Sequence, residues 1–360
     1  MKVKIILALA LFIVSAHFAM AAVADTSTDS ASAVSPDSLE FAVGDVTKIQ
    51  DKNASIKLTD GREVSVEVTD EFTTTPNQVP VVGERFVLGK FDLGGTMTWQ
   101  IYDRYRLAAL LIISAIFVVI LIAVGGWRGV TALAGLAASI GAIIFGVVPA
   151  LAAGYPPLLV ALVGGSAIAA VTIFLAHGFN FRSVLAFFAT IFTLGVSAAF
   201  AVFFTDFASL FGTGTEETFY LSGALFGKLD LRGLLLAGIL LGALGVLDDI
   251  TVAEITTADE LIQANPNLPR REIFRSSLRV GREHIASMVN TLALAYVGVA
   301  LPFILLFAVD GNQPLWALLN SEFAAEEIVR TLVGSLALVL AAPLSCALGA
   351  FFLRRKKRAR

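Results

Sequence analysis

Apolar and polar positions alternate in short runs in the first third of the chain and give way to long uncharged runs in the rest. In "REVSVEV", Val64, Val66 and Val68 alternate with polar side chains, which is the period of a half-buried β-strand. The preceding pair, Asp60 and Gly61, is favoured in tight hairpin turns. Together with the short runs "ERFVLGKF" and "WQIY", this pattern predicts a small β-barrel or β-sandwich over residues 40–102.

Long uncharged runs dominate the remaining sequence, and most of them reach the roughly 20 residues with which an α-helix crosses about 30 Å of hydrocarbon. They cover residues 107–124, 129–154, 156–176, 183–205, 233–247, 285–309 and 331–353. The pattern predicts an α-helical polytopic membrane protein with about seven transmembrane helices in a domain over residues 107–353. The β-rich module is expected to be a small exported domain that precedes it.

The composition agrees with this class, because 57% of the residues are hydrophobic and only 15% are charged. Cys346 is the only cysteine, which excludes a disulfide framework and a thiolate metal site. The sequence motifs of zinc proteases and of phosphate-binding loops are absent. We therefore expect no enzymatic activity and no cofactor, and the sequence leaves open whether a metal binds.

The amino terminus has the features of a secretory signal: two early lysines, an apolar stretch and an A-x-A pattern. We expect a signal peptide over residues 1–21. An uncleaved anchor is the alternative, because the apolar run can be extended to Val23. Residues 22–39 are rich in Ser, Thr, Ala and Asp and predict a flexible linker.

Basic residues gather in alternate loops, as they do on the cytoplasmic side of membrane proteins. With the β-rich domain outside, every inside loop is basic and every outside loop is neutral or acidic. We expect a bacterial cell-membrane protein whose amino-terminal domain is extracytoplasmic and whose basic tail, residues 354–360, is cytoplasmic. The lipid bilayer is the expected partner of this tail, and nucleic acid is not, because no groove-reading motif accompanies it.

The fifth uncharged run has 15 residues, which rise only about 22 Å of the roughly 30 Å that a span requires. Four residues share an arc of roughly 60° on a helix through this run, namely Gly238, Gly242, Gly245 and Asp249. Because small residues let a neighbouring helix approach closely, we expect the glycines to pack against a helix and Asp249 to face packed protein. Asp248 is turned about 100° away.

A carboxylate near low dielectric must bind a proton, a cation or a basic partner, because leaving it charged and alone costs at least about 2.5 kcal/mol. Asp249, with Asp248 beside it, is therefore a candidate for a substrate or ion path. The alternative puts both acids just beyond the headgroups, where they cap the next helix or pair with arginines.

Four arginines of "REIFRSSLRVGREH" recur at helical spacing, namely Arg271, Arg275, Arg279 and Arg282. They predict a helix with one basic face in a cytoplasmic connection. This face either lies on anionic headgroups or docks on the nearby acids at 249, 254, 259 and 260.

The sixth run contains three polar side chains, Asn290, Thr291 and Tyr296, among apolar residues. Such residues either form hydrogen bonds between helices or line a path beside Asp249.

The segments "GILLGALGVLDD" and "GREHIASMVNTLALAYVGVALP", together with a β-module that ends in "DRYR", resemble the YibE/F family of multi-pass membrane proteins. The resemblance covers roughly residues 40–352. It places the family's aspartate, four residues after a GALG-like tetrad, on Asp249 and its Asn-Thr pair on Asn290 and Thr291, whereas Asp248 is an addition in this sequence. The family has no settled activity, so the resemblance implies a topology and motif positions but no substrate.

The leading hypothesis is a protein that moves a small solute or ion, with Asp249 as the binding carboxylate and Asn290 and Thr291 facing it. The alternative is a non-transporting envelope protein that binds a partner or a cell-wall component through its exported β-module. A third hypothesis, an intramembrane hydrolase, rests only on "GVSA" around Ser197. The sequence leaves open the solute, the direction of movement, the energy coupling and whether the chain forms a homo-oligomer.

Overall fold

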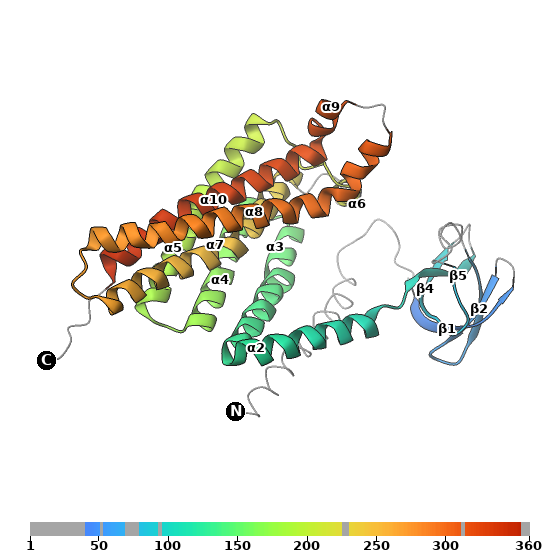
Figure 1. Ribbon diagram of the computed structural model, residues 1–360. Helices are drawn as coiled ribbons and strands as arrows, with labels where there is room; N and C mark the ends of the chain where they lie inside the picture. Colours follow the sequence, from blue (N-terminus) through green and yellow to red (C-terminus); the bar gives the residue numbers. More distant parts are fainter. Residues whose placement is uncertain are drawn as a thin grey trace. The chain divides into compact units, whose positions relative to one another are not determined.

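The computed structural model describes residues 40–50, 53–68, 79–92, 96–224, 230–310 and 314–353 (Figure 1). The predicted signal peptide, linker and basic tail lie outside these residues. The chain forms two compact units that meet between Val124 and Gly125, and each unit is described by itself.

The first unit contains a five-stranded antiparallel sheet with the strand order β3-β2-β1-β4-β5. The strands are β1 (Phe41–Gln50), β2 (Asn53–Leu58), β3 (Glu63–Glu67), β4 (Arg85–Asp92) and β5 (Met97–Arg104). The two outermost strands, β3 and β5, also contact each other, so the sheet curls around its own core. The predicted β-rich domain is therefore confirmed.

Alternation of apolar and polar residues explains which face of the sheet is buried. Val66 and Val68 are buried, whereas Ser65 before them and Glu67 between them are exposed. The largest fully buried side chains of this core include Phe86, Ile56 and Leu88. Gly61 closes the β2–β3 turn with a φ of 88°, a conformation that glycine adopts without strain.

Helices make up the rest of the described chain. They are α2 (Leu107–Ala142), a π-helical turn (Ile143–Val147), α3 (Val148–Ala152), α4 (Pro157–His177), α5 (Phe181–Phe207), α6 (Glu216–Ala224), α7 (Leu231–Ala264), α8 (Arg270–Asp310), α9 (Leu315–Leu319) and α10 (Glu322–Phe352). Within the described residues, six helices are long and apolar enough to cross a membrane.

The first of these six helices covers both of the first two predicted runs. It extends over Leu107–Ala152 with 46 residues and is interrupted at Gly126, whose φ of 55° and ψ of −131° are not helical. The helical segments on either side of Gly126 each correspond to one of these runs. The remaining five helices match the other five runs, so the prediction of a polytopic helical protein is confirmed.

Helix α7 lies at the centre of the second unit and packs against α4, α5, α8 and α10. Figure 1 shows α7, α8 and α10 running alongside one another. Their shared core contains fully buried side chains such as Leu240, Leu247, Ile250 and Leu338. These large aliphatic side chains fix the position of the α7 residues that lie between them.

Two helices continue well beyond the uncharged runs that predict them. Helix α7 has 34 residues and α8 has 41, so they rise about 51 Å and about 62 Å, respectively. The charged segment between the fifth and sixth runs is therefore almost entirely helical. Only the short connection 265–269 separates the two helices.

Candidate functional site

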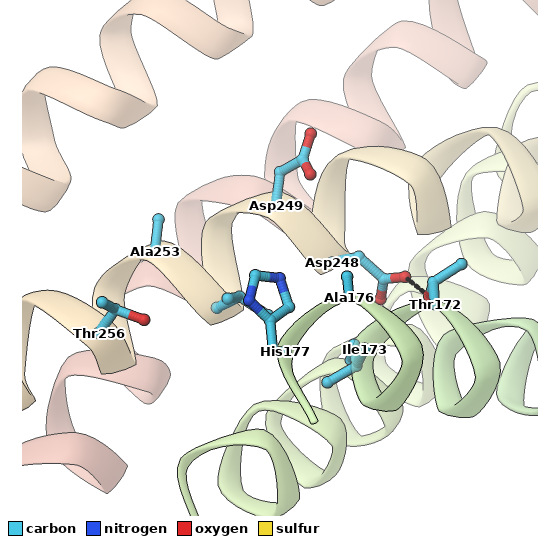
Figure 2. A pocket seen from close by; sticks show the side chains of 9 residues that line it. Thr172, Ile173, Ala176, His177, Asp248, Asp249, Ala253 and Thr256 are labelled. Carbon is cyan, nitrogen blue, oxygen red and sulfur yellow. Dashed lines mark hydrogen bonds between the residues drawn. The ribbon is translucent and has the colours of Figure 1, made fainter. Parts of the chain in front are cut away.

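Asp248 forms a hydrogen bond with a neighbouring helix. The hydroxyl of Thr172 on α4 donates to Asp248 Oδ2 at 2.6 Å (Figure 2). The other oxygen, Oδ1, is buried and has no partner in hydrogen-bond geometry among the described residues, although the hydroxyl of Thr190 on α5 also interacts with this carboxylate. A buried carboxylate oxygen without a partner is costly, so this position calls for a proton, a cation or water.

A pair of buried threonines lies close to the backbone of Asp248. Thr190 on α5 and Thr251 on α7 share a hydrogen bond of 2.8 Å between their hydroxyls. Thr251 lies within 3.2 Å of the carbonyl oxygen of Asp248. These contacts fix α7 against α5 at the level of the acids.

Two clefts meet at the aspartates. The first, of about 400 Å³, lies between the carboxy-terminal end of α4 and α7, and its polar lining is Thr172, His177, Asp248, Asp249 and Thr256. The second, of about 320 Å³, also reaches the α2 residues Leu136 and Ser139. Because Thr172, Asp248 and Asp249 line both clefts, the two carboxylates stand where the clefts adjoin.

The expected orientation of Asp249 is wrong. Asp249 is exposed, and in Figure 2 its side chain points away from Thr172, to which Asp248 is hydrogen-bonded. The 100° turn that separates the two residues brings Asp248, not Asp249, against α4. Asp248, and not Asp249, is therefore the aspartate that a neighbouring helix holds.

The glycine arc is packed at two of its three glycines. A Cβ on Gly238 would lie 3.1 Å from Arg330 Nη1 of α10, and one on Gly242 would lie 2.8 Å from Tyr296 Oη of α8. These glycines make room for the polar ends of side chains from neighbouring helices. No neighbouring atom lies within 4 Å of a Cβ placed on Gly245, which lines the second cleft. Two of the three glycines are thus closely approached by side chains of α10 and α8, and the arc is open at Gly245.

Of the three polar residues in the sixth run, only Tyr296 reaches the glycine arc. Asn290 and Thr291 are exposed and line neither of the two clefts. The hydroxyl of Thr291 donates to the carbonyl of Ser287 on its own helix at 3.0 Å. The expectation that Asn290 and Thr291 face Asp249 is therefore wrong, because α8 presents a different face to α7.

The arginine stripe does not dock on the acids of α7. Arg271, Arg275, Arg279 and Arg282 are all exposed. The buried residues 273, 277 and 281 form the face of α8 that packs inward. Each follows an arginine of the stripe by two positions, which is a turn of roughly 200°, so the arginines lie on the opposite side of the helix. Glu254 pairs with His284, and Asp259 pairs with Arg182 of α5 at 2.9 Å. The alternative, a stripe that lies on anionic headgroups, stays a prediction.

Sequence reasoning did not assign Thr172 or His177 to the site. Thr172 is one of many hydroxyl residues in apolar helices, and no spacing in the sequence distinguishes it. His177 follows a long uncharged run and is placed by its position at a span boundary, but its proximity to α7 depends on helix packing. Among the described residues, no group of three or more His, Cys, Asp and Glu side chains has the arrangement of a metal site.

Comparison with protein families places most of the chain in a known family. The family model of YibE/F-like proteins matches residues 113–355, which includes both clefts and every residue that lines them. Searches of curated proteins and of solved structures returned no significant match.

Proposed function

The chain belongs to the YibE/F-like family of membrane proteins, and we propose that it moves a small solute or ion, specifically a cation, across the membrane. One observation carries this proposal. Asp248 stands where two clefts adjoin, and one of its carboxylate oxygens is buried without a hydrogen-bond partner among the described residues.

The chemistry of the clefts favours a positive charge. Asp248 and Asp249 supply carboxylates, Thr172 and Thr256 supply hydroxyls, and His177 supplies an imidazole. Among the described residues, no lysine or arginine lines either cleft, so a mobile cation is left to neutralise the negative charge. Conduction requires binding that is weak enough to reverse, and a few oxygen ligands suit a transported cation better than a resident one.

The two aspartates take different roles in this proposal. Asp248, held by Thr172, is the binding carboxylate. Asp249 is exposed and exchanges the cation or a proton with the aqueous side, where His177 lines the same cleft. The sequence hypothesis gave the binding role to Asp249, and the contacts of Asp248 are the reason for the change.

The orientation of the protein is part of the proposal. The loop charges support an extracytoplasmic β-rich domain and a cytoplasmic carboxy terminus. With this orientation, the clefts around Asp249 and His177 lie toward the cytoplasmic side. The features of a secretory signal at the amino terminus support a signal peptide, and the proposal places the protein in the cell membrane.

Transport by purified protein in lipid vesicles tests the proposal. Vesicles with and without the protein are loaded with indicators for H⁺, Na⁺, K⁺, Mg²⁺, Ca²⁺, Mn²⁺ and Zn²⁺, and uptake of each cation is measured. We expect wild-type protein to move at least one of them and Asp248→Asn to lower that rate by at least about tenfold. Glu260→Gln, which removes an exposed carboxylate from the same helix, is the matched control and should transport like wild type.

Two results would refute the proposal. One is wild-type protein that moves none of these cations faster than empty vesicles do. The other is correctly inserted Asp248→Asn protein with an undiminished rate.

A further inference from the structure

Glu254 is a second buried acid on α7, and the clefts do not include it. Its side chain is fully buried, with an exposed fraction of 0%. It follows Asp249 by five residues, so the two side chains point about 140° apart around the helix axis. Glu254 therefore faces the packed interior between α7, α8 and α10, whereas Asp249 is exposed and lines the two clefts.

Both carboxylate oxygens of Glu254 have partners from other helices. His284 Nδ1 on α8 lies 2.7 Å from Oε1, and the thiol of Cys346 on α10 donates to Oε2 at 3.3 Å. Gly281 on α8 makes room for the carboxylate, because a Cβ there would lie 3.0 Å from Oε2. One side chain thus connects three helices.

His284 provides the contact of this cluster with water. Its side chain is 42% exposed, although one of its ring nitrogens contacts the fully buried carboxylate. An imidazole in this position can take a proton from the aqueous phase and hold it against a carboxylate that water does not reach. The described contacts of Glu254 include no lysine or arginine that could neutralise it instead.

We propose that Glu254 and His284 form a proton-binding site, and that the bound proton holds the first half of α8 against α7 and α10. With one shared proton, the pair is neutral overall and the buried carboxylate is compensated. When the proton is lost, a negative charge stays in the interior with only hydrogen bonds from a neutral imidazole and a thiol. Uncompensated buried charge is strongly unfavourable, so α8 loosens from the bundle.

Few other charges bear on this pair. From α8 and α10, the titratable groups that contact Glu254 are His284 and Cys346. On α7 itself, Asp249 and Asp259 point toward other sides of the helix, and Asp259 is paired with Arg182 of α5. Four arginines of α8, at positions 271, 275, 279 and 282, are exposed, and Arg270 donates to backbone carbonyls of Ala350 and Phe351 on α10. The Glu254–His284 pair is therefore the expected origin of a pH-dependent change at this interface.

Hydrogen exchange of the full-length protein in lipid nanodiscs tests the proposal. Exchange of peptides that cover residues 277–288 is measured between about pH 6 and about pH 9. The rates are corrected for the intrinsic pH dependence of amide hydrogen exchange. We expect the corrected exchange of wild-type protein to be at least about tenfold faster at the alkaline end. Glu254→Gln, which keeps the shape and removes the charge, should show no such dependence.

Two further variants keep the test decisive. Glu283→Gln removes an exposed carboxylate next to His284 and should behave like wild type. His284→Gln keeps a hydrogen-bond donor but cannot carry a proton, so the carboxyl of Glu254 must bind the proton alone and the pH dependence of exchange should differ from that of wild type. The proposal is overturned by wild-type protein without pH dependence, by the same dependence in Glu254→Gln, or by His284→Gln whose exchange has the same pH dependence as wild type.

This proposal does not rest on the transport function. Exchange is measured without a solute gradient, so a failure of either proposal leaves the other standing.

Discussion

Replacing Gly281 with alanine is the sharpest test of how α8 is packed. An added Cβ would lie 3.0 Å from Oε2, 3.1 Å from Cδ and 3.3 Å from Oε1 of Glu254. Real Cβ atoms rarely come this close to neighbouring atoms, so the carboxylate must move. Because His284 and Cys346 hold that carboxylate, its movement weakens both hydrogen bonds.

Opposing contributions decide the sign of the effect. Alanine is a better helix former than glycine by roughly 1 kcal/mol, which favours the variant. Overpacking costs about 1–3 kcal/mol, and a buried carboxylate that loses a partner costs about 1–3 kcal/mol more. We therefore expect a net loss of about 1–5 kcal/mol in the free energy of unfolding, seen as a lower melting temperature of the detergent-solubilised protein.

Gly298→Ala is the matched control on the same helix. No neighbouring atom lies within 4 Å of a Cβ at Gly298, so only the helix propensity changes there. Its melting temperature should equal or exceed that of wild type. If Gly281→Ala were as stable as Gly298→Ala, the close approach of α8 to Glu254 would be wrong.

Other predictions concern the cleft and the β-rich domain. Thr172→Val removes a hydroxyl that donates to Asp248 and should lower cation uptake about tenfold, whereas Thr257→Val, on α7 but outside both clefts, should leave it near wild type; equal rates in both variants would refute the role of Thr172. In the β-rich domain, hydrogen bonds from Arg85 hold the pKa of Asp45 below its ordinary value of 3.8. The stability that these hydrogen bonds contribute is therefore complete above pH 3.8 and is lost as the pH falls through the lowered pKa of Asp45. Hydrogen exchange of β1 and β4 should become slightly faster in acid, and the effect is small because the Arg85 and Asp45 side chains are about half exposed. Exchange in Arg85→Gln should respond less to acid. An equal response in wild type and Arg85→Gln would contradict this cause.

Much of the fold could be predicted because its signals are local. A period of two residues marks β3, and long uncharged runs mark the membrane helices, whatever the rest of the chain does. The extension of α7 and α8 into charged segments is harder to predict, since amphipathic helices lack the uncharged run that identifies a span. The gap between the first two uncharged runs, at residues 125–128, already indicates an interruption, and the backbone angles at Gly126 place it there.

The site was less predictable because it depends on contacts between distant residues. Helical periodicity correctly places Asp249 with the glycines, but it does not tell whether their shared face is packed or open. Thr172, which decides that Asp248 is the engaged acid, lies 76 residues away in sequence. The partners of Glu254 lie 30 and 92 residues away, so spacing alone could not assign them.

The short apolar run of α7 follows from its central place in the bundle. A helix that meets four others needs little lipid-facing surface, so it can carry acids on two sides where a peripheral helix could not. Asp248 and Asp249 occupy the side toward α4 and the clefts, and Glu254 occupies the side toward α8 and α10. Glu254 and Asp248 are on the same helix. If α8 loosens from α7 at Glu254, the helix that positions Asp248 therefore loses one of its packing partners. The physical basis of both proposals is thus the same: carboxylates that water does not fully reach must find their compensating charge from a mobile cation or proton.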